Sequence, residues 1–277
     1  MDSIYLPRAY LITDVIQETD GEVDVKTFRL AAKSGESLDF MPGQFVELTV
    51  PGFGEAPFGF ASSPKNKDYV ELSIKRVGVV TQAVHDLSPG DAVWLRGPFG
   101  NSFPVREMEG ANILYVAGGL GLAPLRPLID YVFHPENREK YGKTKLLSAA
   151  RTPADFIYKY DVGRWKECRD FEIFQTIDAP YKSWEGRVGF PHELLKTMEI
   201  LPDSLYAVVC GPPIMIKYTA RALKELGVCE SRIITTLEMR MSCGVGKCGK
   251  CNIGRRYVCV DGPVMRLSDL AQMPDEY

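Results

Sequence analysis

The chain has 277 residues, of which 45% are hydrophobic and 25% are charged, and its formal net charge is −3. This length and composition predict two globular domains with a small appendage. The slightly acidic balance excludes a basic surface for nucleic acid, and no segment approaches the roughly 20 apolar residues that span a bilayer. We therefore expect a soluble, cytoplasmic protein.

Residues 1–106 have the pattern of a small antiparallel β-barrel. Short runs of alternating or β-branched residues predict strands at 10–16, 25–30, 45–50, 69–75 and 92–95. Turn sequences such as 41–43 (MPG) and 88–91 (SPGD) separate them, and one helix is expected at 80–87. Several short strands at this spacing are typical of a barrel.

From residue 107 to 236, predicted strands alternate with predicted helices. The strands are expected at 112–117, 145–149, 171–177 and 205–210, and the helices at 124–133 and 214–226. A last strand at 232–237 is expected to close the sheet. This alternation predicts a parallel, doubly wound α/β sheet.

Two loops of this domain suggest a nucleotide site. The first strand ends in 117–124 (AGGLGLAP), where Gly118, Gly119 and Gly121 permit a sharp turn and close approach of a pyrophosphate to a helix N-terminus. Such a turn alone is equally compatible with an ordinary strand-to-helix connection. The loop 210–215 (CGPPIM) follows another strand at the same carboxyl edge, where open α/β sheets bind ligands. Together the loops predict a cleft.

Four of the seven cysteines lie in the C-terminal segment, residues 237–277. Cys243, Cys248 and Cys251 have the spacing C-x4-C-x2-C, and Cys259 follows separately. This is the plant-type arrangement for a [2Fe-2S] cluster, and the intervening glycines let backbone N–H groups point at the sulfurs. A structural zinc site is the alternative, although zinc knuckles usually present two C-x2-C pairs and this segment has one. The length of the chain disfavours a secreted disulfide scaffold.

Four motifs, in this order, resemble the ferredoxin-NADP reductase superfamily over almost the whole chain. They are 41–45 (MPGQF), 97–100 (GPFG), 118–124 (GGLGLAP) and 210–215 (CGPPIM). The cysteine loop with its flanks, 236–241 and 259–264, narrows the resemblance to flavin subunits of multi-subunit redox enzymes. These are the gamma subunit of sulfhydrogenases, the flavin-binding subunit of anaerobic sulfite reductase and the electron-transfer subunit of dihydroorotate dehydrogenase. The resemblance implies an FAD-binding barrel at 1–106, an NAD(P)-binding domain at 107–236 and a [2Fe-2S]-binding segment at 237–277.

The resemblance also implies where FAD binds. The family's flavin-binding strand matches residues 56–63, although Ala56 stands where the family has a phosphate-binding Arg. The flavin contacts it implies are Pro57, Phe58, Gly59, Phe60, Ala61 and Ser62. Gly59 replaces a Ser or Thr of the family, and ordinary barrel packing is the alternative role of Phe58 and Phe60. A second phosphate loop matches 77–81, with Gly78, Val80 and Thr81 expected at the FAD pyrophosphate.

For NAD(H) or NADP(H), the resemblance implies a pyrophosphate end and a nicotinamide end. The pyrophosphate end would comprise Gly118, Gly119, Gly121, Ala123 and Pro124, and the nicotinamide end Cys210, Gly211, Pro212 and Met215. Arg151 lies where an NADP-preferring relative holds the 2′-phosphate, and a surface Arg without a ligand is the alternative. Cys210 is alternatively a small buried residue. Glu238 either approaches the flavin or is an ordinary solvated carboxylate.

These expectations combine into an NAD(P)H-linked electron-transfer subunit. Because a flavin accepts a hydride and can release its electrons singly, it can supply a one-electron [2Fe-2S] cluster. No constellation for a terminal substrate is evident, so we expect a catalytic partner subunit, with a hydrogenase-like complex favoured. The alternatives are the same role in a sulfite reductase or in a flavin-based bifurcating complex with a heterodisulfide-reductase-like partner. A zinc-stabilised, non-enzymatic nucleotide-binding scaffold is the alternative of another class.

Overall fold

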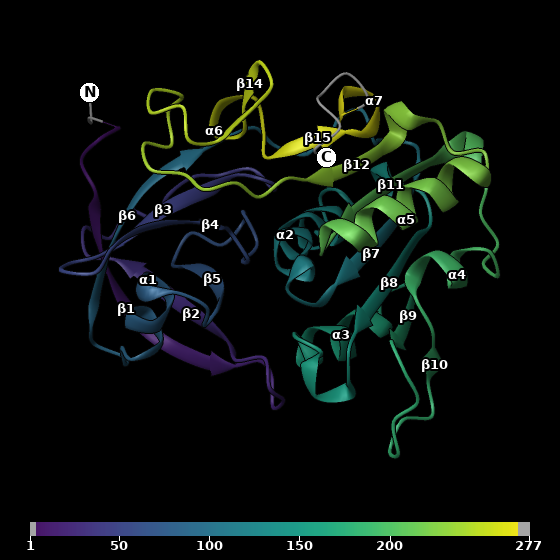
Figure 1. The fold of residues 1–277 in the computed structure, drawn as a ribbon, viewed down its shortest axis with the longest axis horizontal. Helices are drawn as coiled ribbons and strands as arrows, with labels where there is room; N and C mark the ends of the chain where they lie inside the picture. The colour runs from purple at the N-terminus through teal and green to yellow at the C-terminus, as the bar shows by residue number, and fades with distance from the viewer. Residues whose placement is uncertain (1–3, 271–277) are drawn as a thin grey trace.

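The computed structural model describes residues 4–270. Figure 1 shows a β-barrel lobe beside an α/β lobe, with the C-terminal segment running along the top of both. The arrangement confirms the predicted fold class, an antiparallel barrel joined to a largely parallel sheet. In the part of the chain that is described, no helix has the length and apolar character needed to span a membrane.

The barrel lobe is a six-stranded antiparallel sheet in the order β4-β3-β6-β1-β2-β5. Its elements are β1 (Arg8–Gln17), β2 (Val25–Ala32), β3 (Phe45–Val50), β4 (Gly54–Gly59), β5 (Val70–Lys75), α1 (Val79–His85) and β6 (Ala92–Phe99). The chain after β4 closes the barrel, because the Ala61 N–H donates to the Glu71 carbonyl of β5 at 2.8 Å. Side chains alternate along each strand, so β3 places Val46 and Leu48 in the barrel core and Phe45 on the outer face.

The five barrel strands predicted from residue patterns are confirmed, and β4 overlaps the flavin-binding strand that only the resemblance implied, at 56–63. Its sequence, GEAPFG, contains Pro57 and no β-branched residue, so it lacks the usual strand signal. Pro57 is tolerated because β4 is the terminal strand of the sheet order, where a missing backbone donor disrupts no inner ladder.

The α/β lobe is a seven-stranded sheet in the order β10-β9-β8-β7-β11-β12-β15. Its strands are β7 (Asn112–Gly118), β8 (Thr144–Ala150), β9 (Phe171–Ile177), β10 (Arg187–Val188), β11 (Leu205–Cys210), β12 (Ile233–Thr236) and β15 (Val264–Arg266). Its helices are α2 (Leu122–Phe133), α3 (Lys159–Lys166), α4 (Pro191–Leu195) and α5 (Pro213–Glu225). Short 3-10 turns are η1 (Gly119–Gly121), η2 (Arg138–Lys140), η3 (Pro153–Asp155), η4 (Pro202–Ser204) and η5 (Glu230–Arg232).

Both faces of this sheet are covered by helices. Alternate residues of β7 divide between two hydrophobic clusters: Tyr115 packs with α2 and α3, whereas Leu114 and Val116 pack with α4 and α5. Burial on both faces explains why the strands are continuously apolar. The prediction that the strand at 232–237 closes the sheet is wrong, because β15 pairs antiparallel with β12 beyond it.

The C-terminal segment contacts both lobes. Besides β15 it contains β13 (Asn252–Ile253), β14 (Arg256–Tyr257), α6 (Val258–Asp261) and α7 (Leu267–Leu270). Its buried residues, including Ile253 and Val258, pack against Phe45 and Phe99 on the outer face of the barrel. The Asn101 side-chain amide donates to the carbonyls of Asp261 at 3.0 Å and Val264 at 2.8 Å. The cysteine loop is therefore seated on the barrel while β15 extends the α/β sheet (Figure 1).

A buried ion cluster joins the two lobes. Arg126 of α2 donates through Nε to Asp161 of α3 at 2.6 Å. Its Nη1 crosses to the barrel, where it donates to the Ala61 carbonyl at 2.8 Å and the Glu71 carboxylate at 2.5 Å. The ring of Tyr158 lies 4.6 Å from the guanidinium carbon. Both carboxylates are buried, and each also has a more exposed arginine beside it: Arg29 lies 2.9 Å from Glu71, and Arg164 lies 2.8 Å from Asp161. Arg126 is the buried cation that the two carboxylates share.

Replacing Arg126 with Met should lower the free energy of unfolding by about 3 kcal/mol, because it removes the buried cation shared by two buried carboxylates and leaves them only the more exposed Arg29 and Arg164. Arg164→Met is the matched control, since that side chain is 60% exposed and also pairs with Asp161; it should cost no more than about 1 kcal/mol. Thermal unfolding of the two variants measures the difference. Similar, small shifts in both would show that Arg126 does not hold the lobes together.

Candidate functional site

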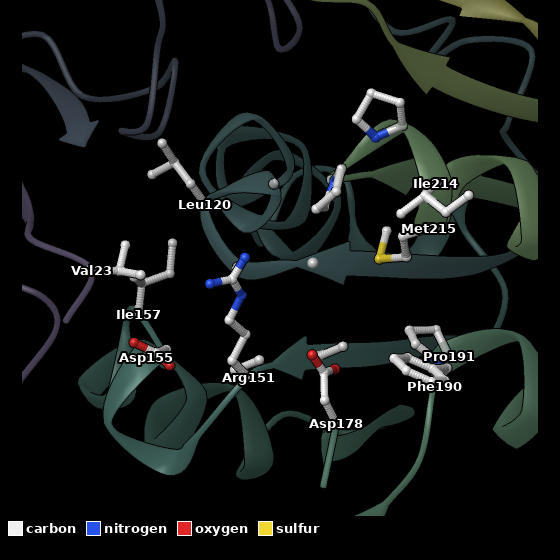
Figure 2. Close-up of a pocket in the computed structure, with 18 of the residues that line it drawn as sticks. Val23, Leu120, Arg151, Asp155, Ile157, Asp178, Phe190, Pro191, Ile214 and Met215 are labelled. Carbon is white, nitrogen blue, oxygen red and sulfur yellow. The ribbon is translucent and has the colours of Figure 1, made fainter. Parts of the chain in front are cut away.

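A cleft of about 650 Å³ lies at the carboxyl ends of β7, β8, β9 and β11, between the α/β lobe and the barrel. Figure 2 shows side chains from both lobes around it, with Val23 on the barrel side and Met215 on the opposite side. The predicted residues that line it are Gly118, Gly119, Gly121, Arg151, Gly211, Pro212, Met215 and Glu238. The two predicted loops therefore meet in one cavity.

The glycines of these loops have different structural roles. A Cβ on Gly121 would lie 2.2 Å from the Cys210 carbonyl oxygen, and one on Gly118 would lie 2.5 Å from the Met215 sulfur. Gly121 requires glycine because its contacts are backbone atoms of the other loop, whereas at Gly118 the nearest atom belongs to the flexible Met215 side chain. Gly119 has a φ of +53°, and a Cβ there would meet nothing within 4 Å. Gly119 is therefore the position at which the loop presents bare backbone to open space.

The remaining predicted residues of this region lie behind the cleft wall. Ala123 is buried in α2, and Pro124 faces the barrel, where a Cβ on Gly59 would be 3.9 Å away. The Cys210 thiol is fully buried and accepts a hydrogen bond from the Thr236 hydroxyl at 3.3 Å. Burial raises the pKa of Cys210 to about 12, so it remains a thiol at neutral pH and is no nucleophile.

The cleft also contains residues that the sequence reasoning missed. Asp178 directly follows β9, just as Arg151 directly follows β8, and both line the cavity. The rule that ligands bind at carboxyl strand ends would have identified Asp178. Three stacked rings, Phe190, His192 and Tyr218, line it as well, and no local pattern in the sequence brings them together.

The residues predicted to contact the flavin, 57–62, differ in burial before and after Gly59. Pro57 and Phe58 are half-buried in β4, where Phe58 also packs against the barrel core, and Gly59 is exposed, so this part of the stretch keeps some accessible surface. The side chains beyond them are committed to the barrel: Phe60 stacks on Phe40 with ring centroids 3.8 Å apart, and Ala61 is fully buried. The Ser62 hydroxyl accepts from the Glu71 N–H at 3.0 Å.

The predicted phosphate loop forms the start of α1. The Thr81 hydroxyl accepts from the N–H groups of Val77 and Gly78 at 2.9 and 2.8 Å, and donates to the Gly78 carbonyl at 2.9 Å. Its proton is thus engaged within the turn. Val80 packs against the barrel core. The donors that remain at this end are backbone N–H groups of the first helical turn, which have no intrahelical acceptor.

The cysteine loop directs backbone N–H groups at its sulfurs. Cys243 Sγ accepts from Val245, Lys247 and Cys248 at 3.3–3.4 Å, and Cys259 Sγ accepts from Gly246 at 3.1 Å. Burial opposes ionisation of Cys243, but these hydrogen bonds outweigh it and lower its pKa to about 6. The loop therefore stabilises a thiolate at Cys243, whereas burial raises the pKa of Cys259 to about 12.

The four sulfurs lie as two pairs. Cys251 and Cys259 have sulfurs 3.2 Å apart, and the Cys248 thiol is within hydrogen-bonding reach of Cys243. Two thiolates bound to one tetrahedral metal at about 2.3 Å lie about 3.7 Å apart, close to the observed separation. Within residues 4–270, no three His, Cys, Asp or Glu side chains are grouped to hold a single metal ion. A pair of thiolates for each of two irons is the donor set of a [2Fe-2S] cluster, so the residues fit this group.

A side chain of the barrel binds the backbone of the cysteine loop. Arg96 of β6 donates to the carbonyls of Cys243 at 3.1 Å and Ser242 at 3.3 Å, and it pairs with the Glu55 carboxylate at 2.5 Å. Glu47, the register partner of Arg96 on β3, is fully buried, and neither of its oxygens has a hydrogen-bond partner among the described residues. Burial and the nearby Glu55 raise the pKa of Glu47 to about 7.

Known domain families match most of the chain. Residues 13–103 match the oxidoreductase FAD-binding domain, and residues 115–221 match the oxidoreductase NAD-binding domain. Residues 238–271 match the iron-sulfur cluster binding domain of dihydroorotate dehydrogenase B. The chain is thus an oxidoreductase with FAD-, NAD- and iron-sulfur-binding domains.

Similar whole chains are redox subunits. The sulfhydrogenase 1 subunit gamma of Pyrococcus furiosus is 41% identical over 245 residues, which cover 86% of this chain and 83% of that protein. The probable electron transfer subunit of dihydroorotate dehydrogenase B (NAD(+)) of Thermococcus kodakarensis is 34% identical, with 92% and 95% covered.

Solved structures agree on the fold. The NADH-dependent reduced ferredoxin-NADP oxidoreductase superimposes with a TM-score of 0.76 at 23% identity, covering 96% of this chain and 89% of that chain. An Amycolatopsis cytochrome P450 reductase superimposes with a TM-score of 0.69 at 26% identity, covering 82% and 68%. The predicted resemblance is confirmed, and the chain belongs to the family of FAD-, NAD- and iron-sulfur-binding electron-transfer subunits that includes sulfhydrogenase gamma subunits and dihydroorotate dehydrogenase B electron-transfer subunits.

Proposed function

We propose that this chain moves electrons between NAD(P)H and a catalytic partner subunit. The observation that carries the proposal is the placement of the C-terminal segment, whose cysteine loop contacts the barrel while its strand β15 pairs with the sheet that bears the nucleotide cleft. When bound, FAD supplies the exchange between a two-electron hydride and single electrons, and a [2Fe-2S] cluster carries single electrons.

The residues of the chain would bind and position these groups. The Gly119 backbone would receive the nucleotide pyrophosphate, with Gly211, Pro212 and Met215 at the nicotinamide end. Phe58 and Gly59 would face the flavin, and the first turn of α1 would offer N–H groups to the FAD phosphates. Cys243, Cys248, Cys251 and Cys259 would hold the cluster. We keep 1–106, 107–236 and 237–277 as the boundaries of the three units.

Exposure of the cysteines indicates where electrons would leave. Cys251 and Cys259 are buried, whereas Cys248 is exposed at the surface between the exposed side chains of Lys247 and Lys250. We propose that the partner docks over Cys248.

A hydrogenase-like partner is favoured, because the sulfhydrogenase gamma subunits of Pyrococcus furiosus are 41% and 37% identical to this chain. The same electron-transfer role in a sulfite reductase is an alternative. A flavin-based bifurcating complex is another, supported by the likeness to the NADH-dependent reduced ferredoxin-NADP oxidoreductase.

Gly119→Ala should weaken NAD(P)H binding at least tenfold and leave FAD content unchanged, because the new methyl would project into open space at the pyrophosphate end of the cleft. Gly110→Ala is the matched control, because Gly110 also has a positive φ, +79°, and also has nothing within 4 Å of an added Cβ. Dissociation constants of NAD(P)H, measured with both variants after their flavin has been fully reduced so that no hydride is transferred, make the comparison. Equal weakening in the two would indicate backbone strain rather than obstruction of the cleft.

Cys251→Ser should abolish the iron-sulfur absorption while retaining most of the FAD, because the loop and the flavin surface are built from different residues. Purified wild-type protein should contain about two irons and two acid-labile sulfides per chain. Cys229→Ser is the control, since Cys229 is exposed and remote in sequence from the loop. Stoichiometric zinc without sulfide would instead support the scaffold alternative.

Isolated protein should reduce artificial electron acceptors with NAD(P)H, because the nucleotide and flavin sites lie within one chain. It should neither evolve hydrogen, nor reduce sulfite, nor oxidise dihydroorotate, since those reactions require the partner. Anaerobic assays with each substrate measure this. Turnover of any of the three by the isolated chain would contradict the role of a subunit.

A further inference from the structure

We infer that the nucleotide cleft selects NADH over NADPH, and that Asp178 is the residue that determines this selectivity. The inference rests on the proposed function and adds the identity of the nucleotide. It comes from the charges at the end of the cleft that would receive the adenosine.

The position of this end follows from the sheet order. The glycine turn after β7 would hold the pyrophosphate, and β11 lies on one side of β7 with the nicotinamide loop at its end. The other side of β7 is occupied by β8 and β9, so the adenosine ribose falls over their carboxyl ends. Arg151 and Asp178 follow these two strands directly.

An aromatic platform lies between Asp178 and the start of α5, the helix that begins at the nicotinamide loop. Phe190 and His192 have ring centroids 5.9 Å apart with planes 13° from parallel, and His192 and Tyr218 are 5.2 Å apart. All three rings line the cleft, and Phe190 is 48% exposed. A flat exposed ring of this kind would stack with adenine equally in NADH and NADPH. Figure 2 shows Arg151, Asp178 and Phe190 along one wall of the cleft. The ribose attached to an adenine on Phe190 would therefore lie near Asp178 and Arg151.

The charges along this wall sum to a negative value. Arg151 contributes one positive charge, whereas Asp155 and Asp178 each contribute a negative one. Burial raises the pKa of Asp178, the positive charge of Arg151 lowers it, and the negative charge of Asp155 raises it, so both neighbours act on Asp178. Asp155 Oδ2 accepts from the Thr152 hydroxyl at 2.8 Å, and its Oδ1 is buried without a partner among the described residues. The Thr152 hydroxyl is uncharged, so this hydrogen bond does not neutralise the Asp155 carboxylate.

This wall suits a hydroxyl better than a phosphate. A ribose 2′-hydroxyl can donate a hydrogen bond to the Asp178 carboxylate, which is the usual basis of NAD recognition. A 2′-phosphate carries close to two negative charges and would meet two carboxylates for one guanidinium. The other charged groups that line the cleft are Lys75, which comes from the barrel strand β5, and Glu238 beside the nicotinamide loop. Lys75 is the cation that would favour NADPH if its side chain reached the ribose.

Equilibrium binding tests the inference on the holoprotein, whose flavin and cluster are first fully reduced by dithionite so that no hydride is transferred, with Kd measured separately for NADH and NADPH by quenching of nucleotide fluorescence under anaerobic conditions. The wild type should bind NADH at least tenfold more tightly. Asp178→Asn should reduce that ratio about tenfold, by strengthening NADPH binding and weakening NADH binding, because it removes one of the two repelling charges. Glu185→Gln is the matched control, since Glu185 is an exposed carboxylate in the same β9–β10 connection and does not line the cleft; its ratio should equal that of the wild type.

Each outcome has a distinct meaning. Equal or tighter binding of NADPH by the wild type overturns the inference but leaves the proposed function intact. In that case, loss of NADPH affinity in Lys75→Gln would show that Lys75 binds the 2′-phosphate. An unchanged ratio in Asp178→Asn, with FAD content and thermal stability like the wild type, overturns the role of Asp178. Failure to bind either nucleotide would overturn the proposed function together with the inference.

Discussion

The organisation of this protein depends on one constraint, which is that the C-terminal segment is attached to both lobes at once. Hydrogen bonds from Arg96 and Asn101 hold the segment on the barrel. Its strand β15 pairs with β12 and so becomes an edge strand of the α/β sheet. The cysteine loop therefore cannot move relative to one lobe without disrupting the other. The ion cluster around Arg126 adds a second attachment between the lobes, so the cleft and the loop keep one geometry.

The local chemistry of the loop follows from this attachment. Thiolates need donors because their charge is costly to bury, and the turn supplies backbone N–H groups for the sulfurs of Cys243 and Cys259. Gly244 packs on the ring of Phe99, where a Cβ would be 2.8 Å from it, so the close seat on the barrel requires glycine. The buried carboxyl of Glu47 under this seat has an unusually high pKa, consistent with a dry interface.

The fold and the grouping of the four C-terminal cysteines were largely predictable because their signals are local. Alternation identifies most strands, and the cysteine spacing is contained within 17 residues, Cys243 to Cys259. The features that the sequence did not predict depend on contacts between residues distant in sequence. Strand β15 is three residues long and forms only because β12 is beside it, and Arg126 contacts Glu71 across 55 positions. In the flavin stretch, the sequence did not reveal that Ser62 and Thr81 use their hydroxyls within the barrel and the turn. Asp178 was identifiable only from its place at the end of a strand.

If one chain connects a nucleotide cleft to an iron-sulfur cluster, electrons from NADH should reach the cluster within that chain. An anaerobic titration of the holoprotein with NADH measures this transfer. Visible absorption would follow the flavin, and electron paramagnetic resonance of frozen samples would follow the cluster. We expect bleaching of the flavin together with the signal of a reduced [2Fe-2S] cluster, without any added partner. Full flavin reduction with no cluster signal, in protein that contains stoichiometric iron and sulfide and whose cluster dithionite reduces, would contradict it.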